Sequence, residues 1–70
     1  MMLLIDIGNT SIVCALYNEN TYLKIIRIEK IINVESTLNS FLKYKIQSIA
    51  ICSVSPNKTD IFIEKINKIF

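Results

Sequence analysis

Two short breaks in the first half of the sequence limit the fold more than any other feature. They separate three runs rich in Ile, Leu, Val or Tyr, which are typical of β-strands, at residues 2–7, 11–17 and 22–29. The breaks, at residues 8–10 and 18–21, are long enough only for hairpin turns. A crossover between parallel strands needs about a dozen residues or more. The sequence therefore predicts an antiparallel meander of three strands.

The second half of the chain changes its hydrophobic period. Two stripes with the spacing i, i+4, i+7, i+8 predict amphipathic helices. The stripes are Val34, Leu38, Phe41 and Leu42, with Asn33 as the predicted N-cap, and Phe62, Ile66, Ile69 and Phe70, which follow Pro56. Between them, residues 46–54 predict a fourth strand. Its core, residues 49–52, is continuously apolar, a pattern typical of a strand covered on both faces.

The predicted order is β-β-β-α-β-α. A helical crossover joins strands in parallel, so we expect the fourth strand to run parallel to an earlier neighbour, which we assign as the first strand. This arrangement is the start of an α/β domain with a mixed sheet.

The length of the chain argues against a self-sufficient domain. A domain near 70 residues buries only about 60% of the surface that its unfolded chain exposes. The sequence has no His and two Cys, so it can form at most one disulfide and no structural zinc site of the usual kind. The second predicted helix ends on Phe70 without a cap, and the sheet leaves an unpaired edge. We expect residues 1–70 to be a truncated N-terminal domain of a larger protein.

Composition excludes several classes of function. Eight Lys and Arg face six Asp and Glu without a basic run, which disfavours nucleic acid as a partner. The longest apolar stretches, residues 1–5 and 12–16, are far shorter than the roughly 20 residues of a membrane span. We therefore expect a cytoplasmic protein that binds neither nucleic acid nor membranes. In that compartment Cys14 and Cys52 are expected to act as small buried hydrophobes.

One motif suggests chemistry. Asp6 interrupts the first apolar strand and is followed by Gly8, Asn9, Thr10 and Ser11. A charged carboxylate within a strand core is costly unless it is paired or bound to a metal. Backbone and side-chain donors of the turn suit phosphate oxygens, and the carboxylate suits a divalent metal. The alternative is an ordinary hairpin turn whose preceding Asp lies in water, because the same residue types dominate turns.

The motif resembles a known family. Residues 2–13, Met-Leu-Leu-Ile-Asp-Ile-Gly-Asn-Thr-Ser-Ile-Val, are similar to the N-terminus of type III pantothenate kinases, which phosphorylate pantothenate in the first step of coenzyme A synthesis. Residues 49–56, Ile-Ala-Ile-Cys-Ser-Val-Ser-Pro, resemble that family's second segment, a strand that ends in Ser-Ser-Val-Val-Pro before a helix. Cys52 and Ser55 depart from it, so a structural role is expected there, with Ser53 and Ser55 as helix caps before Pro56. The resemblance implies a ribonuclease H-like fold, shared with acetate and sugar kinases, heat-shock chaperones and actin.

The resemblance also implies a site. The ATP-binding residues would be Asp6, Ile7, Gly8, Asn9, Thr10, Ser11, Ile12 and Val13. Asp6 would also be the ligand of Mg²⁺ or a similar divalent ion. A monovalent cation, K⁺ or NH₄⁺, would bind elsewhere in the full-length enzyme, which would be a homodimer. The family's Gly-x-Asp-Arg segment, which supplies the catalytic Asp and binds pantothenate, has no counterpart in these residues.

Three hypotheses follow. The first is that the chain is the ATP-phosphate-binding part of a pantothenate kinase and is inactive by itself. The second is a non-catalytic relic or interaction module that pairs through its exposed sheet edge and helix faces. The third is an accessory regulatory factor, for which the sequence offers no positive feature.

Overall fold

The computed structural model describes all residues from 1 to 70. Its elements in chain order are β1 (Met2–Ile7), β2 (Ile12–Asn18), β3 (Thr21–Ile28), the 3₁₀ turn η1 (Ile31–Asn33), α1 (Val34–Asn39), β4 (Ser48–Ser53) and α2 (Pro56–Ile69). This order confirms the predicted β-β-β-α-β-α. Every strand boundary lies within two residues of its predicted position.

The four strands form one mixed sheet in the order β3-β2-β1-β4. β1 pairs with β2 and β2 pairs with β3 in antiparallel register, whereas β4 runs parallel to β1. The fold class and the parallel pairing of the first and fourth strands are therefore confirmed. The tight β2–β3 hairpin turns at Glu19 and Asn20, whose φ angles of 49° and 65° are those that short hairpins prefer.

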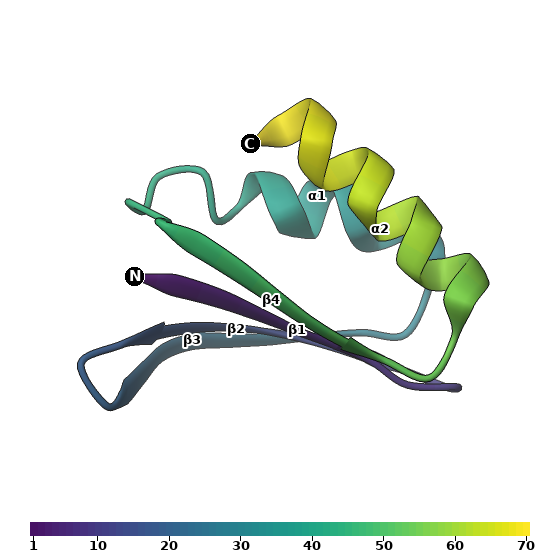
Figure 1. The fold of residues 1–70 in the computed structure, drawn as a ribbon, viewed down its shortest axis with the longest axis horizontal. Helices are drawn as coiled ribbons and strands as arrows, with labels where there is room; N and C mark the ends of the chain where they lie inside the picture. The colour runs from purple at the N-terminus through teal and green to yellow at the C-terminus, as the bar shows by residue number, and fades with distance from the viewer.

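Both helices cover one face of the sheet (Figure 1). Because side chains alternate along a strand, Leu3, Ile5 and Ile7 of β1 all point to this side, where they are at most 1% exposed. Phe41 and Phe62, from the helical layer, are fully buried against them. The core is thus a single layer between the sheet and the helices.

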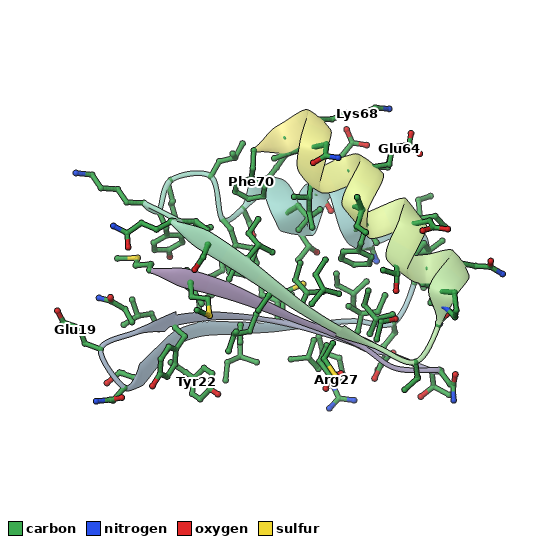
Figure 2. The ribbon with its side chains drawn as sticks, viewed as in Figure 1. Glu19, Tyr22, Arg27, Glu64, Lys68 and Phe70 are labelled. Carbon is green, nitrogen blue, oxygen red and sulfur yellow. The ribbon has the colours of Figure 1, made fainter.

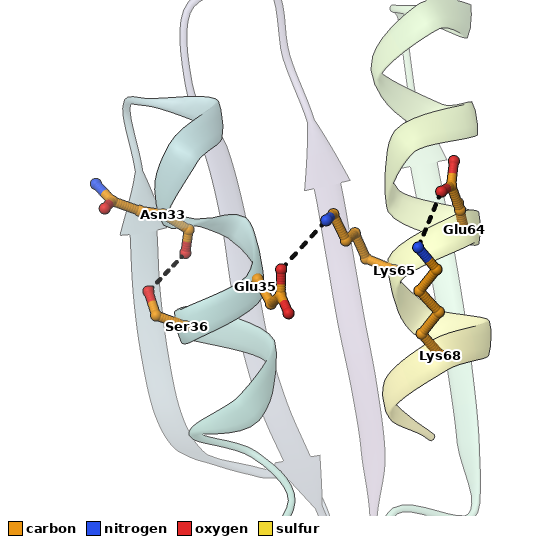
Figure 3. Close-up of polar contacts among 6 residues, drawn as sticks. All are labelled: Asn33, Glu35, Ser36, Glu64, Lys65 and Lys68. Atoms are coloured by element: carbon orange, nitrogen blue, oxygen red, sulfur yellow. Dashed lines mark hydrogen bonds and ion pairs between the residues drawn. The ribbon is translucent and has the colours of Figure 1, made fainter.

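The first helix is shorter than its apolar stripe. α1 ends at Asn39, and Phe41 enters the core from the following turn, where its N–H donates to the Leu38 carbonyl at 3.1 Å. The predicted contribution of Leu42 to the core is wrong, because its side chain is 49% exposed beyond the helix end. Asn33 is at the N-cap position but its side chain caps nothing. Instead, Ser36 Oγ donates to the Asn33 carbonyl at 3.1 Å (Figure 3).

The second helix and the fourth strand also depart from expectation. In α2, Phe62 is buried and Ile66 and Ile69 pack against the core, but Phe70 at the end is 42% exposed. β4 is not covered on both faces, because helices lie on one side of the sheet only. Cys52 is consequently exposed, whereas Cys14 is buried as predicted.

The other face of the sheet is open. A hollow of about 500 Å³ on this side is lined by Leu4, Ile5, Asp6, Val13, Ala15, Tyr22, Ile25, Ala50, Ile51 and Cys52. Figure 2 shows Tyr22 and Arg27 on the side of the sheet away from the helices. The open face is therefore mainly apolar, with charged side chains near one end.

Candidate functional site

The turn between β1 and β2 is closed by its own backbone. The Gly8 N–H donates to the Ser11 carbonyl at 2.9 Å. A Cβ atom at position 8 would lie 3.0 Å from the same oxygen, closer than side chains normally approach. Glycine is thus favoured at position 8 because two backbone segments approach closely within the turn.

The tip of this turn presents unused donors. The side chains of Asn9 and Thr10 are exposed, and neither backbone N–H donates a hydrogen bond within the chain. Two adjacent amides without acceptors are suited to bind an anion. The loop therefore has the donor groups that the sequence motif suggested.

Asp6 lies beside this loop, on the open face. It is the last but one residue of β1, and its register partners are Val13 on β2 and Cys52 on β4. The carboxylate is exposed and has no hydrogen bond or ion pair within the chain. Of the two interpretations of this carboxylate, the structure agrees with the one in which it lies in water, because strand alternation turns it to the side without helices. The carboxylate is accessible to a ligand from solvent, so the cost of burying a charge is not the reason to expect a metal there.

The corner between β4 and α2 meets the same end of β1. The Val54 N–H donates to the carbonyl of Ile7, the last residue of β1, at 3.1 Å, which continues the parallel pairing one residue past the end of β4. Ser53 Oγ accepts the Ser55 N–H at 3.0 Å and the Thr59 hydroxyl at 2.6 Å. Ser55 itself is the N-cap residue of α2, but its side chain makes no capping bond. The two serines thus shape the corner, although only Ser53 does so through its side chain.

The predicted ATP-binding residues separate into two groups in the structure. Ile7 and Ile12 point to the helices and are 0% and 3% exposed, so their side chains belong to the core. Val13 is half-buried on the open face. Ser11 Oγ accepts a hydrogen bond from Arg27 Nη1 at 3.2 Å. The groups brought together and left accessible are Asp6 and the turn that follows it.

Two basic residues of this region lie outside the motifs that the sequence singles out. Arg27 belongs to the third predicted strand, and Lys58 lies among the polar residues of the second predicted helix. Lys58 Nζ donates to the carbonyls of Asn9 and Gly8 at 2.9 and 3.4 Å. The available signal was its place two residues after Pro56, in the first turn of the helix that follows the second motif.

A comparison with protein families identifies the family to which the motif and the rest of the chain belong. The model of the type III pantothenate kinase family matches residues 2–70. The chain belongs to the type III pantothenate kinase family. The match includes both segments that carried the resemblance, and with them the turn and the corner that meet at the end of β1. A comparison of the chain with curated proteins finds no match.

The side chains of this chain limit the kind of metal that it can hold. No group of three or more His, Cys, Asp or Glu side chains forms a metal cage. The exposed, unpartnered carboxylate of Asp6 fits Mg²⁺, which commonly binds through one or two carboxylates together with phosphate and water. In addition, neither helix of the chain has the length and apolar character needed to cross a bilayer.

Proposed function

We propose that the chain is the ATP-phosphate-binding part of a pantothenate kinase. The reaction is ATP + pantothenate to ADP + 4'-phosphopantothenate, the first step of coenzyme A biosynthesis. Family membership supports this assignment. The observation that carries the placement of the site is the pair of unpartnered amides of Asn9 and Thr10 beside the exposed carboxylate of Asp6.

Each accessible group has a task in this proposal. The amides of Asn9 and Thr10, with their side chains, donate to phosphate oxygens. Asp6 holds Mg²⁺ directly or through water, since a bare carboxylate would repel the phosphate tail. When bound there, Mg²⁺ would supply positive charge that offsets the charge of the phosphates. Ile7, Ile12 and Val13 support the loop through packing.

The proposal extends to the full-length enzyme. It is a cytoplasmic homodimer that also uses K⁺ or NH₄⁺, whose site we do not place within residues 1–70. The catalytic Asp of the family's Gly-x-Asp-Arg segment has no counterpart in the sequence. We therefore propose that the 70-residue chain binds the phosphates of ATP but does not phosphorylate pantothenate. ATP-dependent formation of 4'-phosphopantothenate by the purified chain would refute that statement.

The test of the site is the substitution Asp6→Asn. Isothermal titration of the chain with Mg·ATP should show an affinity lowered roughly 10- to 100-fold, the range for losing a group that supports a metal site. Removing Mg²⁺ with EDTA should weaken binding to the wild-type chain by a similar factor and change the Asn variant little.

A matched control is Glu64→Gln, which removes a carboxylate from the outer surface of α2 (Figure 2). This variant should bind Mg·ATP as tightly as the wild-type chain. Equal affinity of the wild-type and Asp6→Asn chains would contradict the placement of the phosphate site.

The open face favours a second candidate function, a non-catalytic module that pairs with a second copy of itself. Tyr22 and Ile25 on this side are 56% and 62% exposed. Analytical ultracentrifugation of the purified chain distinguishes the candidates. A folded monomer that binds Mg·ATP supports the kinase proposal, and a self-associating chain without nucleotide affinity supports the module.

A further inference from the structure

Lys58 is the one side chain of α2 that forms hydrogen bonds with the turn after β1. It lies in the first turn of the helix, and its half-buried ammonium group donates to Asn9 O at 2.9 Å and to Gly8 O at 3.4 Å. These contacts join segments 49 and 50 residues apart in the sequence. The lysine therefore fixes the tip of the turn to the helical layer.

The two carbonyls belong to the same peptide groups as the two free amides. The Gly8 carbonyl shares a peptide plane with the Asn9 N–H, and the Asn9 carbonyl with the Thr10 N–H. All peptide bonds are trans, so the C=O and N–H of each plane point in opposite directions. Drawing both carbonyls toward α2 directs both N–H groups away from it, to the open side of the sheet. Asp6 lies on that same side.

The charge of Lys58, like its position, favours binding of an anion on the side of the turn away from α2. Carbonyl oxygens turned toward a phosphate would repel it, and the ammonium group both turns them away and balances their partial negative charge. A cation on the carbonyl also polarises the peptide group, which makes the opposite N–H a stronger donor. The other bonds of the turn, Gly8 N–H to Ser11 O and Arg27 to Ser11 Oγ, do not hold these two carbonyls.

We propose that Lys58 is a positioning residue of the phosphate site, which orients the Asn9 and Thr10 amides toward the open face by holding the carbonyls behind them. The inference rests on the proposed function for its ligand, the phosphate tail of ATP. Lys58 does not touch the phosphates. It acts through the backbone of the turn.

The test compares three variants of the chain. Lys58→Met keeps the length of the side chain and removes its donors, whereas Lys58→Arg keeps a charge and paired donors. Lys68→Met is the matched control, because it removes the same charge from the exposed far end of α2. Thermal unfolding followed by circular dichroism verifies that each variant is folded before the measurements below.

The first measurement is made without nucleotide. Backbone ¹⁵N relaxation gives order parameters for Asn9 and Thr10, which should fall from near 0.85, a rigid backbone, to below about 0.6 in Lys58→Met. The Lys58→Arg and Lys68→Met chains should keep the wild-type values. Unchanged order in Lys58→Met overturns the inference, whatever the nucleotide affinity.

The second measurement is the Mg·ATP affinity by isothermal titration. Lys58→Met should bind roughly three- to tenfold more weakly, as expected for losing a charged hydrogen bond that acts indirectly. Lys58→Arg should recover most of this loss, and Lys68→Met should show none. Weaker binding with unchanged order parameters would mean that Lys58 acts through its charge alone and would also overturn the positioning role.

The two proposals fail in different ways. If the wild-type chain does not bind Mg·ATP, the proposed function is wrong, while a turn that loosens only in Lys58→Met still supports the structural part of the inference. If the wild-type chain binds and the turn is unaffected by Lys58→Met, the proposed function survives and the inference does not.

Discussion

The two faces of the sheet come from the same strands but differ in almost every property. On the covered face, Leu3, Ile5 and Ile7 alternate into a core with no buried polar group. On the open face, Leu4 and Asp6 of the same strand meet solvent and a hollow of about 500 Å³. The comparison shows that stability is concentrated on one side of β1 and candidate chemistry on the other.

This separation has a consequence for mutagenesis. A substitution on the covered face removes packing and should change the free energy of unfolding. Neither Asp6 nor Lys58 belongs to the buried core, so a substitution at either position should change binding instead. The following experiments compare groups that differ in burial, beginning with the largest expected change in stability.

Phe62→Ala should have the largest effect on stability. Phe62 is 0% exposed at the centre of the helical layer, and removing such a ring costs about 3–5 kcal/mol. A single core in a chain of this length rarely supplies more than about 3–5 kcal/mol, so the variant should be largely unfolded. Urea unfolding followed by far-UV circular dichroism measures the change.

The matched variant is Phe70→Ala, at the end of the same helix. Phe70 is 42% exposed, so its loss should lower the free energy of unfolding by less than about 1 kcal/mol. Equal losses for the two phenylalanines would show that the covered face is not where the stability resides.

The burial of Cys14 predicts that the free energy of unfolding depends on pH, with a change of intermediate size. Burial raises the pKa of the Cys14 thiol to about 11, from an ordinary value of 9.0. The thiol therefore stays protonated in the folded chain at pH values where the unfolded chain has lost that proton. Its contribution to stability is complete below pH 9 and is lost as the pH rises to 11, a change of roughly 2 to 3 kcal/mol.

Comparison with a variant that lacks the thiol separates the titration of Cys14 from that of the other groups. The free energies of unfolding of the wild-type and Cys14→Ala chains are compared between pH 8 and pH 11. The stability advantage of the wild-type chain over the variant should decrease or reverse as the pH rises. Cys52→Ala on the open face is the control and should follow the wild-type slope. A wild-type slope in Cys14→Ala would disprove the assignment to the buried thiol.

The elements were predictable because their signals are local. The length of the two breaks determines the antiparallel meander, and the change from strand runs to a helical stripe locates the crossover that makes β4 parallel to β1. The end of α1 and the exposure of Cys52 were not predictable in this way. The exposure of Cys52 depends on which face the helices cover, and the sequence of β4 is apolar on both sides. The end of α1 at Asn39 falls inside an apolar stripe that continues to Leu42, so the stripe does not show it.

The candidate site was predictable only in part, for the same reason. Asp6 and the turn are adjacent in sequence, so residue types alone singled them out. The exposure of Asp6 depends on the phase of β1 relative to the helices, which residue types in the motif do not reveal. Lys58 contacts the turn across about 50 residues, and only the packing of α2 on the sheet brings it there.

The smallest expected effect comes from the ion pairs of the helical layer (Figure 3). Lys65 Nζ lies 3.2 Å from Glu35 Oε2 and joins α2 to α1, with side-chain exposures of 32% and 60%. Such pairs contribute about 0.2–1 kcal/mol, because water competes for both charges. A double-mutant cycle with Glu35→Gln and Lys65→Met should give a coupling energy in this range.

The cycle has an internal reference in α2. Lys68 and Glu64 form an exposed pair one helical turn apart, which should contribute about 0.3–0.5 kcal/mol. Both couplings should decrease in 1 M NaCl, where the Debye length is about 3 Å. Because the helices meet the sheet through apolar contacts, breaking either pair should leave the affinity for Mg·ATP unchanged. A coupling between Glu35 and Lys65 as large as the loss from Phe62→Ala would mean that charge, rather than apolar packing, holds the covered face together.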